Sequence, residues 1–410
     1  MKLTGHTIGI DVAQLWNRLA HNQARPLAAR ASVSALFFIN GALFATWVSR
    51  IPVLQIQHQL SHAELGAALF AMALGAIVAM PLAGFLTTQF GSRVIAKIAA
   101  ISYCAFTPLL ALAPNTALFV MSLVAFGVVH GGLDVAMNAQ AVVVESLYRR
   151  PIMSSFHSLF SIGGLVGSAG GGLLAKWNFS PVDHFVLVSV LLGTTALVTF
   201  PTLNTINEPL RGTSRTQQIP LSFRVPSSTL LALGIVAFCS MVGEGAMADW
   251  SALYLRDVHH TSESFATTGY AIFSISMAVG RLSGDSLAAK IGPTRLVRIG
   301  AHSSIVGLLL ALLASDTATV LVGFAVVGFG FATIVPLVFS AAGQVNGGAP
   351  GVALASVTTI GYLGFIIGPP LIGFLADFIG LRGALGILVA FTLSAGALAP
   401  VVQTSKNSQQ

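Results

Sequence analysis

The chain has 410 residues, of which 8% are charged and 55% are hydrophobic. Soluble domains carry roughly 25% charged residues, because polar side chains must cover their surface. The composition therefore excludes a soluble enzyme, a disordered chain and a disulfide-rich secreted scaffold, and it indicates a polytopic membrane protein. The only two cysteines of the sequence, Cys104 and Cys239, lie in apolar segments, so we expect no disulfide framework and no metal site.

Twelve stretches of the chain are apolar and long enough to cross a bilayer as helices, which takes about 20 residues. They predict spans at 31–50, 63–88, 94–114, 117–146, 152–176, 183–203, 228–255, 264–289, 294–314, 318–344, 351–377 and 382–402. Strands of a membrane barrel would instead alternate polar and apolar residues over about 10 positions. These stretches are longer and unbroken, so helices are favoured.

The distribution of basic residues supports this count of spans. With the N-terminus in the cytoplasm, 16 of the 20 Lys and Arg residues fall on the cytoplasmic side, and the other four are Arg50, Lys176, Arg256 and Arg382. This bias follows the positive-inside rule, and a missed or added helix would destroy it. We therefore interpret the net charge of +7 as a consequence of the membrane topology, with both termini cytoplasmic, and not as a sign of nucleic-acid binding.

The two halves of the sequence resemble each other. Residues 123–132 align with 321–330, the glycines of span 5 align with those of span 11, and Trp47 matches Trp250. Two parallel six-helix repeats are an architecture of secondary transporters, with the substrate site between the halves near the bilayer midplane. We expect an all-α membrane protein made of two pseudo-symmetric bundles, divided as an N-terminal tail 1–30, a bundle 31–204, a linker 205–227, a bundle 228–402 and a C-terminal tail 403–410.

Three short motifs carry a family resemblance. Residues 84–93 read G-F-L-T-T-Q-F-G-S-R, residues 373–382 read G-F-L-A-D-F-I-G-L-R, and a third copy begins at Gly280 and continues to Gly292. They resemble the loop motif of the major facilitator superfamily, although Thr88 replaces the usual Asp of the first copy. The resemblance implies turns in which an Asp/Arg pair locks one helix against its neighbours in one access state. The implied gating residues are Gly84, Arg93, Arg281, Asp285, Asp377 and Arg382, with Arg281 and Asp285 as a pair.

A narrower resemblance involves spans 4 and 7. Asp134 followed by Asn138 is similar to the signature of the fucose-permease-like branch, in which these residues line the cavity. Glu244 to Trp250 is similar to the signature of the bacterial YbjJ-like inner membrane proteins in that branch, and this implies the bacterial inner membrane. Span 1 lacks the acidic residue of fucose-permease-like proteins, so a fucose-like substrate is not implied.

Three carboxylates are the clearest cases of acids away from the ends of predicted spans. A charge there costs about 2.5–3.5 kcal/mol on insertion scales unless it faces a cavity or the bundle interior. Asp134 is expected to share one polar helix face with His130 and Asn138. Glu244 and Asp249, five residues apart, point about 140° apart, so only one can face a given wall. Neighbouring glycines at 243 and 245 favour local unwinding. We predict Asp134, Glu244 and Asp249 as proton-coupling groups, with structural hydrogen bonds as the alternative.

Further polar and aromatic residues of the spans are candidates for contact with a solute. The Asn138 amide offers donors and an acceptor, and indole rings can stack on a sugar or a planar ring. Helix packing is the alternative for each of them. The predicted solute-binding residues are Asn40, Trp47, Asn138, His157, Trp250 and Tyr362.

These features predict a secondary active transporter that moves a small polar organic solute by alternating access, as a monomer in the membrane lipid. Protons are preferred over sodium as the coupling ion because the acids are scattered along the chain. The alternatives are a multidrug or metabolite proton antiporter and a non-transporting membrane sensor, which would call for an added soluble domain. The sequence contains no hydrolase or nucleotide-binding motif, so we expect no enzyme activity, no catalytic residue and no cofactor.

Overall fold

The computed structural model describes residues 12–148, 152–203, 227–342, 344–345 and 350–403, and all regular elements in these ranges are helices. The first half contains α1 (Val12–Val48), α2 (Ile51–Gln57), α3 (His62–Phe90), α4 (Ser92–Phe106), α5 (Leu109–Leu112), α6 (Thr116–Tyr148), α7 (Met153–Lys176) and α8 (Pro181–Leu203). The second half contains α9 (Ser228–His259), α10 (Glu263–Ala266), α11 (Thr268–Ile291), α12 (Pro293–Leu313), α13 (Thr317–Phe331), α14 (Ile334–Ala342), α15 (Pro350–Ala397) and a 3-10 turn at Ala399–Val402.

Ten helical segments of the described residues are long and apolar enough to cross a membrane. One of them, α15, is two spans, because Gly380 with φ 72° interrupts its helical path, a conformation that only glycine adopts at little cost. The more polar α11, 24 residues long, is the twelfth span. The predicted all-α fold of about twelve membrane helices is confirmed.

Helix boundaries differ from the prediction where proline interrupts the hydrogen-bond pattern. The predicted span 94–114 breaks into α4 and α5 at Pro108. The span 318–344 breaks into α13 and α14, because Pro336 has no N–H to donate to the carbonyl four residues earlier. Helix α1 begins at Val12, within the predicted tail 1–30, and the predicted linker lies outside the described residues up to position 226.

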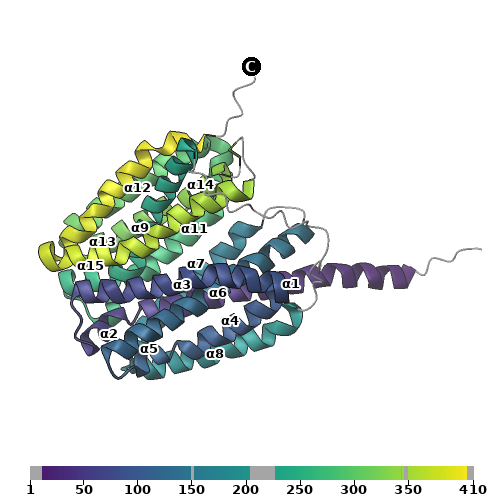
Figure 1. The fold of residues 1–410 in the computed structure, drawn as a ribbon, viewed down its shortest axis with the longest axis horizontal. Helices are drawn as coiled ribbons and strands as arrows, with labels where there is room; N and C mark the ends of the chain where they lie inside the picture. Colours follow the sequence, from purple (N-terminus) through teal and green to yellow (C-terminus); the bar gives the residue numbers. More distant parts are fainter. Residues whose placement is uncertain (1–11, 149–151, 204–226, 343, 346–349, 404–410) are drawn as a thin grey trace, which may run out of the picture.

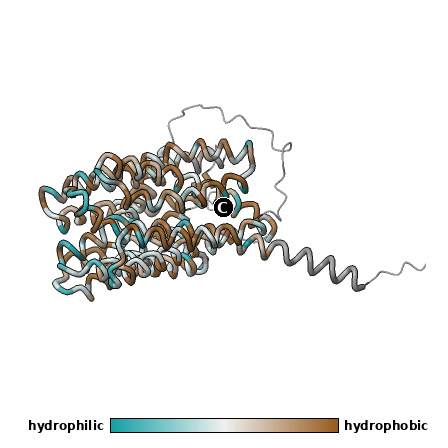
Figure 2. The backbone as a smooth tube through the Cα atoms, turned by 90° about the horizontal axis from the view of Figure 1, so that it is seen from below, coloured by the Kyte–Doolittle hydropathy of each residue, from teal (hydrophilic) through white to brown (hydrophobic). Residues whose placement is uncertain are grey.

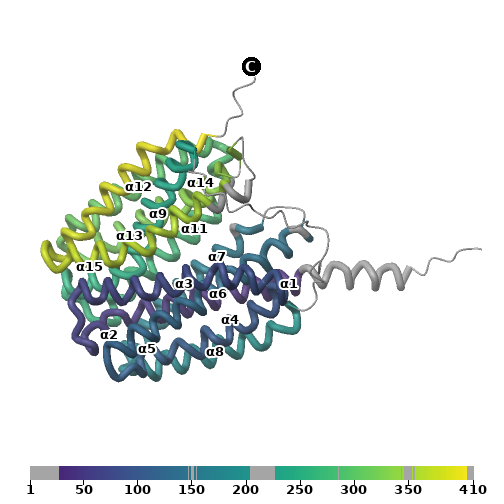
Figure 3. The backbone as a smooth tube through the Cα atoms, viewed as in Figure 1, coloured from purple at the N-terminus to yellow at the C-terminus, as the bar shows by residue number. Residues whose placement is uncertain are grey.

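The two halves contact each other mainly through two helix pairs, α3 with α15 and α7 with α11. Figure 1 shows the halves side by side at the left and diverging to the right, and Figure 3 traces the same path as a tube. We call the end with the α1–α2, α7–α8 and α9–α10 connections and the Gly380 bend the closed end. The end with the turns at Gly91 and Gly292 is the divergent end.

The α3–α15 crossing near the closed end depends on two glycines. A Cβ added at Gly66 would lie 2.6 Å from the carbonyl oxygen of Pro369, and one at Gly373 would collide with the carbonyl oxygen of His62. Small residues allow membrane helices to approach this closely. The two halves are therefore in backbone contact at this crossing.

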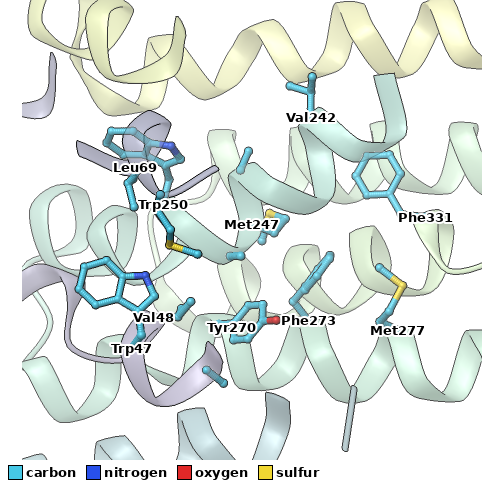
Figure 4. Packing of buried hydrophobic residues seen from close by; sticks show 14 of the residues in the cluster. Trp47, Val48, Leu69, Val242, Met247, Trp250, Tyr270, Phe273, Met277 and Phe331 are labelled. Carbon is cyan, nitrogen blue, oxygen red and sulfur yellow. The ribbon is translucent and has the colours of Figure 1, made fainter. Parts of the chain in front are cut away.

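The helices are hydrophobic along most of their length, and hydrophilic residues gather most clearly at the left of Figure 2, which is the closed end. Large apolar side chains on the outer faces are exposed, as expected for contact with lipid; examples are Val198, Leu313 and Phe378. The core between helices includes a cluster around Trp47, Trp250 and Tyr270 (Figure 4).

Candidate transport site between the two halves

Asp134 lies in the middle of α6 with an amide as its neighbour. The Asn138 Nδ2 donates to the Asp134 carbonyl oxygen at 2.8 Å and to the carboxylate Oδ1 at 3.3 Å. The two predicted residues therefore meet on one helix face. Within the described part of the chain, no cation lies within ion-pair distance of Asp134.

Asn40 links α1 to α6 inside the first half. Its Oδ1 lies 2.9 Å from the His130 Nδ1 and its Nδ2 lies 3.5 Å from the Met137 sulfur, and the side chain is fully buried. His130 also stacks on Phe44 at 5.5 Å. The amide is thus occupied by packing contacts, and the structure gives no support for its predicted contact with a solute.

Glu244 and Arg281 form an ion pair that reaches across the two halves. The Arg281 Nη2 lies 3.2 Å from the Glu244 Oε2, and its Nη1 donates to the Ser161 Oγ at 3.0 Å. Ser161 belongs to α7 in the first half, whereas Glu244 and Arg281 belong to α9 and α11 in the second. The predicted partner of Arg281 in the gating motif, Asp285, has a side chain outside the described residues. Among the described residues, Arg281 contacts two other helices.

Asp249 differs from Glu244. It is partly exposed, and it makes no hydrogen bond or ion pair with any side chain that the structure describes. Helix α9 is continuous past both carboxylates, because Gly243 packs against Phe331 and Gly245 against Phe365. The predicted unwinding next to Glu244 is therefore wrong, and the glycines serve close packing.

Aromatic and imidazole side chains surround these charges. Tyr362 of α15 lies near enough to Asp134 of the first half and Glu244 of the second to feel both charges. Tyr270 of α11 interacts with Glu244, Asp249 and Arg281. His157 of α7 interacts with Arg281 and packs edge-on against Phe37 at 5.2 Å.

Trp47 and Trp250 do not line open space. Both are fully buried, and neither indole N–H finds a hydrogen-bond partner among the described residues. Trp47 packs against Phe119 at 6.0 Å, and Trp250 lies over the His62 ring at 6.2 Å. In this conformation both rings are therefore packing residues, and their stacking on a solute stays a prediction.

Arg50 joins the two halves at the closed end. Its side chain is 2% exposed and its Nη1 lies 2.6 Å from the Glu263 Oε1 in the second half. Its Nε donates to the His184 Nδ1 at 3.0 Å, and its Nη2 donates to the Phe179 carbonyl oxygen at 3.1 Å. The guanidinium thus uses all three of its nitrogens to hold α1, α8 and α10 together.

Arg256 makes the reverse connection from the second half to the first. Its guanidinium donates to the Pro52 carbonyl oxygen at 2.5 Å and to the Gln55 Oε1 at 2.6 Å, and it pairs with Asp257. Asp257 lies 3.2 Å from the His62 Nε2 of α3. Sequence reasoning missed this set of contacts. The available signal was that Arg50 and Arg256 depart from the positive-inside bias.

The predicted gating residues have mixed outcomes. Asp377 accepts from the backbone N–H groups of His62 at 3.0 Å and Ala63 at 3.3 Å, whereas Arg382 donates to the Ala314 carbonyl oxygen at 3.5 Å. Asp377 and Arg382 thus contact different partners, and their role in gating stays a prediction. At the divergent end, a Cβ added at Gly84 would meet nothing within 4 Å. The half-buried Arg93 starts α4 beside Gly91.

Comparisons with known proteins agree with this architecture. Residues 32–365 match the sequence pattern of the Major Facilitator Superfamily. An uncharacterised MFS-type transporter of Yersinia pestis is 35% identical over 384 residues, which cover 93% of this chain and 98% of the relative. The membrane protein MosC of Rhizobium meliloti is 36% identical over 363 residues, which cover 88% of this chain and 86% of the relative.

Solved structures of transporters share the fold. A bacterial homologue of the human lysosomal transporter Spinster, inward-facing and unoccupied, has a TM-score of 0.69 and 18% identity, covering 93% of this chain and 97% of its own. A D-xylose–proton symporter has a TM-score of 0.70 and 17% identity, covering 93% and 98%. The Escherichia coli fucose:proton symporter has a TM-score of 0.62 and 18% identity, covering 92% and 98%. None of these comparisons separates the fucose-permease-like branch from other branches.

Proposed function

Because this chain belongs to the Major Facilitator Superfamily of transporters, we propose that it moves a small polar organic solute across the bacterial inner membrane by alternating access, coupled to protons. In this proposal the chain works as a monomer with both termini in the cytoplasm. The divergent end then faces the cytoplasm and the closed end faces the periplasm, so that the structure represents an inward-facing state. In the same proposal, residues 205–227 are the linker between the two six-helix bundles.

One observation carries the proton-coupling proposal. Each half contributes a carboxylate from within a membrane helix, Asp134 from α6 and Asp249 from α9, and neither has a cation partner among the described residues. An ionised carboxylate at this depth is costly unless water reaches it. When both ends of the pathway close, desolvation favours the protonated form. The change between inward-facing and outward-facing states then depends on whether Asp134 and Asp249 are protonated.

Glu244 has a separate role in this proposal. Its ion pair with Arg281 helps to hold Arg281 against Ser161 of the other half. A proton on Glu244 removes one charge of the pair and weakens the link between the halves near the middle of the membrane. Asn138 and Tyr362, which lie beside these charges, supply the hydrogen bonds for a solute with hydroxyl or amide groups.

The proposal is tested in proteoliposomes with an imposed pH gradient. Labelled sugars, polyols, amino acids and nucleosides are screened for gradient-driven accumulation by the wild-type protein. Asp134→Asn and Asp249→Asn are expected to lower accumulation at least about tenfold, because an amide of similar shape cannot release a proton. Exchange of labelled for unlabelled solute, which needs no net proton movement, is expected to persist in at least one of the two variants.

The matched control is Asp183→Asn, which makes the same chemical change at an exposed carboxylate at the start of α8. It is expected to accumulate solute at the wild-type level. Accumulation by Asp134→Asn and Asp249→Asn equal to that of this control would contradict proton coupling through these groups. The absence of transport for any solute by the wild-type protein, with or without a gradient, would contradict the transport proposal itself.

A further inference from the structure

A groove at the divergent end of the second half lies outside the candidate transport site. It has a volume of about 480 Å³ and forms where α12 begins, beside the 3-10 turn that α12 contacts. Sites for small molecules have volumes of roughly 300–1,000 Å³, so the groove is large enough for a small ligand. Its lining includes Pro293, Thr294, Arg295, Arg298, Pro400 and Gln403.

The groove is positively charged. Arg295 and Arg298 are exposed and three positions apart, so they lie on one face of α12. Within the part of the chain that the structure describes, no carboxylate lies within ion-pair distance of either guanidinium. The planar guanidinium matches the oxygens of carboxylates and phosphates. Both side chains are therefore available to an anion.

The first turn of α12 adds backbone donors to the two guanidinium groups. The helix is 21 residues long, and its N-cap is Gly292 with φ 83°, so no side chain at the cap accepts from the first-turn N–H groups. Pro293 has no N–H, which leaves those of Thr294 and Arg295 without an acceptor in their own helix. Donors in this position, together with the helix dipole, favour a bound anion.

A buried hydroxyl at the same place also has no partner. The Thr294 Oγ1 is shielded from solvent and makes no hydrogen bond with any residue in the described ranges. A buried polar atom without a hydrogen bond is costly. Because Thr294 lines the groove, an oxygen-rich ligand at the start of α12 would give this hydroxyl an acceptor.

The matching helix start in the first half uses its polar groups differently. Helices α4 and α12 both follow a glycine with positive φ. At α4 the Gln140 Nε2 donates to the Ser92 Oγ at 2.7 Å, and the Lys97 Nζ lies 5.6 Å from the centre of the Phe200 ring. Lys97 takes the place of Arg298 in the repeat. The first half thus engages this cation in its own packing, whereas the second half presents it in a groove.

We propose that this groove binds a phosphate group through Arg295, Arg298 and the first turn of α12. A phosphate accepts hydrogen bonds from several directions and pairs with guanidinium groups in a bidentate way. Helix α12 is long and apolar enough to cross a membrane from its first residue, so its first turn lies at the level of the lipid headgroups. A phospholipid headgroup and free phosphate are the two sources of this chemistry. The inference does not depend on the transport function proposed above.

The test measures binding to the purified full chain in an uncharged detergent by isothermal titration calorimetry. The titrants are dioctanoyl phosphatidylglycerol, inorganic phosphate and dioctanoylglycerol, which has the same acyl chains but no phosphate. Phosphatidylglycerol is expected to bind and dioctanoylglycerol is not. Inorganic phosphate that binds and displaces the lipid would identify free phosphate as the source, whereas binding of the lipid alone would identify the headgroup. Binding of neither phosphate compound, or equal binding of both dioctanoyl lipids, would overturn the inference.

Three variants locate the site. Arg295→Gln and Arg298→Gln each remove one guanidinium at an exposed position and are expected to weaken binding about tenfold. Thr294→Val removes the hydroxyl and is expected to weaken binding about threefold.

The matched control is Lys97→Gln, which removes the cation at the equivalent position of the other half and at the same end of the molecule. It is expected to bind with wild-type affinity. If both arginine variants bind as the wild type does, the groove is not the site. An equal loss of affinity in Lys97→Gln would also contradict the inference, because the ligand would then respond to the charge of the whole face.

Discussion

Substitutions at the contact between Arg50 and Glu263, at the closed end, can separate an effect on folding stability from an effect on the balance between the closed and open states of this end. Arg50 is buried and bonds to three groups, but only Glu263 lies in the second half. The Glu263 side chain is 34% exposed, so its ion pair is screened and contributes about 1 kcal/mol. Glu263→Gln is therefore expected to shift the balance between closed and open states of this end about fivefold.

Arg50→Ala has a larger and different effect. It also leaves the His184 Nδ1 and the Phe179 carbonyl oxygen without their donor inside the first half. Breaking a buried charged network by removing one partner costs about 3–5 kcal/mol, so the melting temperature is expected to fall by several degrees. For Glu263→Gln the melting temperature is expected to stay close to that of the wild type.

The assay combines thermal melting in detergent with a distance measurement. Spin labels are attached at Ala117→Cys and Ser315→Cys, two exposed positions at the closed end of the first and second halves. We expect the two readouts to separate: Glu263→Gln changes the distance distribution, and Arg50→Ala changes both the distances and the melting temperature. An unchanged distance distribution in Glu263→Gln, together with a shifted one in Arg50→Ala, would refute a role for the ion pair. In that case Arg50 would act only through the packing of its own half.

Two further predictions concern a tryptophan and a histidine at the closed end. Trp250→Phe is expected to leave the melting temperature nearly unchanged, because the indole N–H has no partner among the described residues. Trp250→Ala should cost about 3–5 kcal/mol of stability by leaving a cavity. Equal losses of stability in both variants would contradict an unused N–H. Burial against Phe119, whose ring centroid is 4.4 Å away, lowers the pKa of His58 below its ordinary value of 6.5. The unfolded chain then takes up a proton more readily than the folded one, so stability is complete above pH 6.5 and falls as the pH drops below it. The His58→Gln variant should lack this part of the pH dependence in a melting series from pH 7.5 to 5, and an unchanged slope would contradict the assignment.

The fold could be predicted because its signals are local. Apolar runs of sufficient length specify membrane helices on their own, and the spacing of four residues brings Asn138 to Asp134 on any α-helix. The predicted helix ends still differ from the observed ones near Pro108 and Pro336. Hydropathy alone does not register that proline has no N–H to donate within a helix.

The pairing of charges could not be predicted in the same way. The loop motif indicates a gating role for Arg281, but it does not indicate that the guanidinium reaches Glu244 and Ser161 on two other helices. The choice among partners depends on how helices cross, and the sequence pattern does not contain that information. Trp47 and Trp250 illustrate the same limit, since their matching positions indicated symmetry correctly but not whether the rings face solute or protein.

Helix α9 carries both the central acids and the closed-end contacts on one uninterrupted rod. Glu244 and Asp257 are separated by 13 residues of continuous helix, which corresponds to about 20 Å along the axis. A rigid element of this length cannot tilt at one position without displacing the other. Any rotation of α9 that follows a change at Glu244 therefore moves Arg256 and Asp257 relative to α2 and α3. The charge of Glu244 at the membrane centre is thus mechanically coupled to the contacts that hold the closed end together.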